Sequence, residues 1–136
     1  MNFKEIRVGL TQEFEVFIDK YLVNRFADIS GDFNPLHMDE DYAKKTTYGK
    51  RVVHGMLLSS LFSRLVGMHL PGDRALYLQQ SLKFKNPAFI GDTVTVKGSV
   101  TSISKDLRII TLDTFILNLE GKVLLEGEAK VLFRSD

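Results

Sequence analysis

The sequence contains no cysteine among its 136 residues. This excludes disulfide bonds, thiolate metal sites and a cysteine nucleophile. There is also no run of 18 apolar residues, so we expect no membrane-spanning helix. Neither sign of charge is in excess, because 18 Lys and Arg residues balance 17 Asp and Glu residues. We therefore expect neither nucleic acid nor an anionic membrane as a partner.

The motifs of several enzyme classes are missing as well. There is no P-loop and no Gly-x-Gly-x-x-Gly segment, which argues against a nucleotide-binding α/β domain. There is no Gly-x-Ser-x-Gly segment, so a serine hydrolase is not expected. The first residues, MNFKE, lack the basic and apolar regions of a signal peptide. The expected location is the cytoplasm.

What remains is the composition of an ordinary globular domain. Hydrophobic residues make up 44% of the chain and charged residues 26%, which is typical of soluble proteins. The length fits one compact unit with its own core. We therefore expect residues 1–136 to form a single domain.

The first half of the chain is predicted to be mixed and then helical. Residues 3–32 are typical of one or two short strands around the turn at Gly9, followed by a short helix over residues 21–29. The best helix candidate covers residues 54–68, where apolar residues recur at i, i+3, i+4 and i+7. Only Arg64 in this segment is charged, so we expect the helix to be buried on most sides.

The second half is predicted to be all strand. Residues 74–134 alternate between apolar and polar with a period of two, which predicts four long strands in a meander. An apolar helix needs an apolar sheet to pack on, and a curved antiparallel sheet around it is the simplest arrangement. The fold class is therefore α+β, and the free edge of the sheet favours pairing with a second subunit.

Asp32 and His37 lie five residues apart, with an Asn34-Pro35 turn between them. Such a turn can bring a carboxylate and an imidazole together around one water molecule, as general acid–base catalysis requires. Other interpretations stay open at this point: Asp32 could cap a turn or helix, and His37 could be a structural histidine. Asp32, His37 and Asp39 could also form a metal-ligand set, although their spacing matches no known metal motif.

His54 and Gly55 stand at the start of the predicted central helix. The N-terminus of a helix presents free N–H groups, and a glycine lets a ligand oxygen approach them closely. A thioester or ester carbonyl placed there would have its developing negative charge stabilised, as in an oxyanion hole. The alternatives are close packing of Gly55 against a strand and a helix cap or core hydrogen bond for His54, which we favour for the His54 side chain.

Five blocks of the sequence resemble one enzyme family. The segment FADISGDFNPLHMD at residues 26–39 is similar to the hydratase-2 motif of MaoC-like dehydratases, and to the short (R)-specific enoyl-CoA hydratases of bacteria in particular. The similarity continues, in the same order, through four more segments: VHGMLL (53–58), LPG (70–72), YLQQSLKF (77–84) and GD (91–92).

The resemblance implies a hot-dog fold, in which an antiparallel sheet wraps a long central helix. It implies reversible syn hydration of trans-2-enoyl-CoA to (R)-3-hydroxyacyl-CoA, for polyhydroxyalkanoate storage or fatty acid metabolism. It also implies a homodimer or a dimer-based oligomer. No metal or organic cofactor is expected, and coenzyme A is part of the substrate.

The resemblance also implies roles for individual residues. Asp32 and His37 are the expected acid–base pair, and Gly55 N–H is the expected donor to the thioester oxygen. Asn34 is expected to shape the loop that holds the pair. A further set on the far half of the helix is expected to line the acyl pocket: Ser63, Leu65 and Val66.

Three alternative functions remain. A hot-dog thioesterase would place a carboxylate on or near the central helix, whereas residues 54–68 contain no Asp or Glu. A dehydratase acting on acyl-carrier-protein or unusual CoA thioesters is not separated from the hydratase by sequence. A binding module that has lost catalysis is disfavoured by the intact motif residues.

Overall fold

The protein is described here by a computed structural model that covers all residues, 1–136. Its core is one antiparallel sheet with the strand order β1-β4-β5-β6-β2, and β3 also pairs with β6. The strands are β1 (Thr11–Phe17), β2 (Ala75–Gln80), β3 (Lys83–Phe84), β4 (Thr93–Ser104), β5 (Ile109–Asn118) and β6 (Val123–Phe133). The helices are α1 (Lys20–Ser30), α2 (Pro35–Met38), α3 (Glu40–Lys44) and α4 (Gly55–Arg64).

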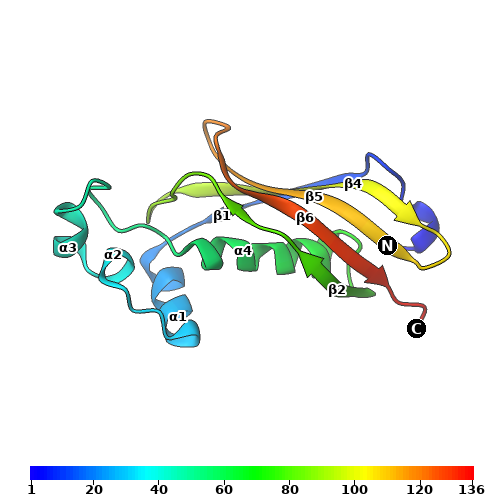
Figure 1. The fold of residues 1–136 in the computed structure, drawn as a ribbon, viewed down its shortest axis with the longest axis horizontal. Coiled ribbons are helices and arrows are strands. Elements are labelled where there is room, and N and C mark those ends of the chain that lie inside the picture. The colour runs from blue at the N-terminus through cyan, green and yellow to red at the C-terminus, as the bar shows by residue number, and fades with distance from the viewer.

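The central helix α4 lies along one face of the sheet (Figure 1). It continues as a π-helical turn over Leu65–His69, which confirms the helix predicted for residues 54–68. Leu58, Phe62 and Leu65 from this run are buried against inward-facing strand residues. A side chain on Gly98 of β4 would come within 2.8 Å of Leu65 Cδ2, so this glycine lets the helix approach the sheet closely. Together these features form the helix-on-sheet layout of a hot-dog fold.

Helices α1, α2 and α3 gather at one end of the sheet, beside the N-terminus of α4, while both chain termini lie at the other end (Figure 1). The short helix predicted for residues 21–29 is confirmed as α1. Asp19 caps it by accepting a hydrogen bond from Leu22 N at 2.9 Å. The candidate site residues 32–55 therefore lie at one end of the molecule, in the connection between α1 and α4.

Near Gly9 one strand forms, β1, in agreement with the one or two short strands expected there, and Phe3–Glu5 is a short 3-10 turn. Two other details of the sequence-based fold were wrong. The meander contains only the three long strands β4, β5 and β6. The shorter β2 pairs with the outer side of β6, because β1 already occupies the free side of β4.

The second difference concerns the burial of the central helix. One face of α4 and its π-helical turn remains uncovered, and Met56 and Met68 are 55% and 74% exposed. A single sheet can cover only the side of the helix that faces it, so this segment carries more apolar side chains than the sheet can bury. No helix of the structure is long and apolar enough to cross a membrane.

Candidate active site

A tight turn after α1 positions Asp32. The helix ends at Gly31, which has the positive φ of 78° that glycine tolerates, and the Gly31 N–H donates to Ala27 O at 2.8 Å. Asp32 N then donates to Ser30 Oγ at 3.1 Å. The Asp32 carboxylate accepts a hydrogen bond from Asn34 N at 3.1 Å through Oδ1, which leaves Oδ2 free to face the next helix.

Asn34 links this turn to the short helix that carries His37. Its side-chain Oδ1 accepts a hydrogen bond from Leu36 N at 3.0 Å, so it is the N-cap of α2. Pro35 follows at the first helical position, where its missing N–H leaves no bond unmade. The predicted role of Asn34, shaping the loop between the two candidate catalytic residues, fits this geometry.

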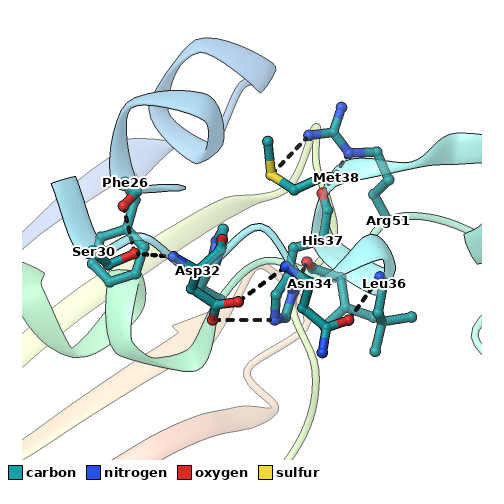
Figure 2. Close-up of polar contacts among 10 residues, drawn as sticks. Phe26, Ser30, Asp32, Asn34, Leu36, His37, Met38 and Arg51 are labelled. Carbon is teal, nitrogen blue, oxygen red and sulfur yellow. Dashed lines mark hydrogen bonds and ion pairs between the residues drawn. The ribbon is translucent and has the colours of Figure 1, made fainter. Parts of the chain in front are cut away.

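The side chains of Asp32 and His37 point toward each other (Figure 2). Asp32 Oδ2 lies 4.0 Å from His37 Nε2, which is too long for a direct hydrogen bond. On the other side of the imidazole, Nδ1 lies 2.7 Å from the carbonyl oxygen of Val52. A carbonyl only accepts, so Nδ1 carries a proton and donates it. Nε2 is therefore the nitrogen of His37 that can exchange a proton with a substrate or a water.

Arg51 fixes α2 from its other end. Its guanidinium donates through Nε to the carbonyl oxygen of His37 and through Nη2 to Asn24 Oδ1 at 3.1 Å. Figure 2 shows Arg51 beside His37 and Met38. The side chain is 8% exposed. Because these two bonds join α2 to α1, Arg51 holds the helix that carries His37 against the helix that precedes Asp32.

A cleft of about 370 Å³ opens beside His37 and the start of α4. Its walls include His37, Gly55, Leu58 and Phe84. Gly55 is the first residue of α4, and neither its N–H nor that of Met56 has a hydrogen-bond partner within the protein. This free N–H, close to His37, has the features of the predicted oxyanion donor.

The predicted acyl-pocket residues do not line this cleft. Ser63 is exposed on α4, and Leu65 and Val66 are buried between helix and sheet. Their assignment to an acyl pocket stays a prediction.

The metal-ligand set considered from the sequence is not assembled. Asp39 is occupied as the N-cap of α3, where its Oδ1 accepts from Tyr42 N at 3.1 Å. A different third residue, His54, lies with Asp32 and His37, so that one possible ligand atom from each lies within 4.8 Å of the others. The Nε2 atom of His54 is already committed, because it lies 3.0 Å from the backbone carbonyl oxygen of Asp32.

Comparison with known proteins places this arrangement in a family. The family described as "MaoC like domain" matches residues 4–114. The chain belongs to the MaoC-like family. It is 44% identical over 131 residues to the (R)-specific enoyl-CoA hydratase of Aeromonas caviae, covering 96% of this chain and 98% of that one. It is 41% identical to the enzyme of the same description from Rhodospirillum rubrum, covering 96% and 90% of the two chains.

Solved structures agree with this assignment. The (R)-hydratase from A. caviae involved in PHA biosynthesis superposes with a TM-score of 0.94 at 43% identity, over 96% of this chain and 99% of that one. The hot-dog fold expected from the resemblance is therefore confirmed for this MaoC-like chain.

Sequence reasoning missed three contributors to the MaoC-like site. The Val52 carbonyl oxygen sets the proton position on His37, and Arg51 anchors α2. Phe84 forms a wall of the cleft at Gly55. Val52 and Arg51 act on His37 through contacts that span about 15 residues of sequence, so no local sequence pattern indicates them. Phe84 lies within the resembling block at 77–84, which was the one available signal.

The first prediction concerns the space around Gly55. A Cβ atom on this residue would come within 2.7 Å of two carbons of the Phe84 ring. We expect Gly55→Ala to displace the ring into the cleft and to lower kcat/KM for an enoyl thioester by about 100-fold, since small misplacements at a reacting centre have effects of that size. Steady-state kinetics would measure it.

Gly67→Ala is the matched control, because it lies in the same helical run and its Cβ would meet nothing within 4 Å. It should keep full activity. In the Phe84→Ala background, which removes the clash, adding Gly55→Ala should have little further effect. An equally large loss in that background would contradict the steric explanation.

A second prediction follows from His54, which is 2% exposed. Burial lowers the pKa of its imidazole below the ordinary value of 6.5, and the nearby His37 and Arg51 lower it further, against the opposing effect of Asp32. Above pH 6.5 the residue is neutral in both the folded and the unfolded chain. As the pH falls below 6.5, the unfolded chain takes up a proton that folded His54 does not, so the free energy of unfolding decreases.

The decrease attributable to this one residue approaches about 1.4 kcal/mol per pH unit at most. Urea unfolding between pH 5 and 7.5 would measure it, and His54→Gln should give a smaller slope than the parent chain. Equal slopes would show that the buried imidazole does not resist protonation.

Proposed function

We propose that the protein is an (R)-specific enoyl-CoA hydratase, a hydro-lyase that adds water reversibly to trans-2-enoyl-CoA. The observation that carries the proposal is the pairing of Asp32 Oδ2 with His37 Nε2 across 4.0 Å, with His37 lining the same cleft as the free N–H of Gly55. The relatives from A. caviae and R. rubrum, both described as (R)-specific enoyl-CoA hydratases, support it.

The gap between the pair suits one water molecule. If a water oxygen lay about 2.8 Å from both Asp32 Oδ2 and His37 Nε2, the angle between the two atoms at that oxygen would be roughly 90°, near the H–O–H angle of water. Both groups can accept a hydrogen bond, so the two protons of the water are held and a lone pair of its oxygen is left for the substrate.

The reaction then balances without a cofactor. The water oxygen bonds to C3 as one of its protons passes to the pair, and the π electrons of the C2=C3 bond move toward the thioester carbonyl. Gly55 N–H stabilises the negative charge on that oxygen. The pair returns one proton to C2, which restores the starting protonation state and releases (R)-3-hydroxyacyl-CoA. Asp32 and His37 share these proton transfers.

We propose a homodimer as the working unit. Strand β2 is an edge strand, and its outward residues Leu76 and Leu78 are about half exposed. The uncovered face of α4 adds exposed Met56 and Met68, and Phe84 at the cleft is 56% exposed. Apolar surface beside an unpaired strand edge supports pairing with a second copy. A cytoplasmic location is part of the proposal, because CoA thioesters are made and used inside cells.

Hydration of crotonyl-CoA tests the proposal. Purified protein should remove the absorbance of the conjugated enoyl thioester, and the product should be oxidised by an (R)-specific but not by an (S)-specific 3-hydroxyacyl-CoA dehydrogenase. Release of free CoA thiol without hydration would instead identify a thioesterase. Activity only on the carrier-protein thioester would identify a dehydratase of that class. Inactivity on all these substrates would leave a binding module.

A further inference from the structure

We propose that His54 is the positioning residue of the acid–base pair, which it holds in place as a neutral imidazole protonated on Nε2. This inference rests on the proposed hydratase function. His54 is the N-cap residue of α4, yet its side chain makes no capping bond to that helix. The ring is instead turned toward Asp32 and His37, and it contacts both of them.

The contact with Asp32 is a hydrogen bond to its main chain. His54 Nε2 lies 3.0 Å from the backbone carbonyl oxygen of Asp32, so Nε2 must be the donor. The Asp32 N–H is held separately by Ser30 Oγ. Both main-chain polar groups of Asp32 are therefore fixed, and His54 supplies the one bond that comes from outside the turn itself.

The contact with His37 is a stack of the two rings. Their centroids lie 4.1 Å apart and their planes are inclined by 29°. Phe26 packs on the His54 ring as well, with a centroid distance of 4.9 Å. The bond from His37 Nδ1 to Val52 O fixes one edge of the His37 ring, and the stack fixes its plane. Nε2 of His37 is thereby aimed at the Asp32 carboxylate.

The remaining nitrogen of His54 shows that the ring acts as a neutral group. Its Nδ1 is the one buried side-chain nitrogen or oxygen in the structure without a hydrogen-bond partner. An unprotonated Nδ1 leaves only a lone pair without a partner, which is tolerated, whereas a proton on Nδ1 would create a buried N–H with no acceptor. It would also add a positive charge beside the His37 ring. The two stacked histidines therefore carry their protons on opposite nitrogens, Nδ1 in His37 and Nε2 in His54.

Two substitutions both remove the stacked ring but differ in whether they keep the hydrogen bond to Asp32. The amide nitrogen of His54→Gln reaches about as far as Nε2 and can donate to the Asp32 carbonyl, whereas the shorter amide of His54→Asn reaches only about as far as Nδ1. We expect His54→Asn to lower kcat for crotonyl-CoA hydration on the order of 30-fold with little change in KM, because the pair is displaced while the cleft remains. His54→Gln should stay within about threefold of the parent.

The outcomes are distinct. If the parent chain hydrates crotonyl-CoA but His54→Asn matches it in kcat, or His54→Gln is as slow as His54→Asn, the hydrogen bond to the Asp32 carbonyl does not position the pair and the proposal is wrong. If the parent chain itself is inactive, the proposed function fails instead. His69→Asn is the control, because that ring stacks on Phe14 away from the site, and it should leave kcat unchanged.

A measurement on the parent chain tests the proposed protonation of His54 without requiring that the variants fold. The chain has three histidines, so ¹⁵N-labelled histidine gives a spectrum in which each ring can be assigned. We expect two-bond ¹H–¹⁵N correlations at pH 7.5 to show His37 protonated on Nδ1 and His54 on Nε2. The same tautomer in both rings, or a protonated His54, would overturn the proposal.

Discussion

Asp32→Asn should lower kcat for enoyl-CoA hydration by about 1,000-fold or more, within the range that general acid–base catalysis contributes. The substitution keeps the fold of the turn, because the amide oxygen can still accept the hydrogen bond that Asp32 Oδ1 accepts from Asn34 N. What is lost is the acceptor that faces His37 Nε2, where an NH₂ group would stand instead. A water in the gap could then no longer give its proton to this side.

Asp28→Asn is the matched control for this prediction. Asp28 is an exposed carboxylate on α1, four residues before Asp32, so its loss changes the charge equally without touching the pair. It should leave kcat within about twofold. Comparable losses in the two variants would mean that the effect is one of net charge or stability rather than of the reacting carboxylate.

His37→Asn should have the second-largest effect, a loss of about 100-fold to 1,000-fold in kcat. The asparagine amide can replace Nδ1 as the donor to Val52 O, so the local fold is kept. Nothing replaces Nε2, which is the atom that faces Asp32. The loss of enoyl absorbance from crotonyl-CoA, followed over long times at several enzyme concentrations, would measure rates this low.

Combining the two substitutions tests whether the residues act together. If Asp32 and His37 hold one water between them, removing either disables the unit, and the double variant should be at most a few-fold slower than the slower single variant. A loss equal to the product of the single losses would indicate two independent catalytic contributions.

The site was predictable from the sequence to the extent that it is local. Asp32, Asn34 and His37 lie within one turn, so spacing alone suggested that a carboxylate and an imidazole meet, and the structure places them 4.0 Å apart. The support behind the pair was not predictable in this way. Val52 and His54 reach it from a segment 15 to 22 residues further along, and their contacts depend on how α4 packs on the sheet.

The fold was predictable for a similar reason. The apolar repeat of α4 and the alternation in β4, β5 and β6 are local signals, and all four elements form where they were expected. Strand order is a long-range property. The position of β2 beside β6 depends on β1 occupying the side of β4, and nothing within residues 74–134 reveals that.

The pairing of β1 with β4 also constrains how the chain can fold as it is synthesised. Thr11 bonds Ser99, 88 residues later, so β1 leaves the ribosome long before its only partner strand exists. The segment that carries the site lies between these strands and packs on a helix that needs the later sheet. Native-like order in the first half of the chain must therefore wait for the second half, which is typical of slow-folding, long-range topologies. Nascent chains that end before β4 should remain open to proteases.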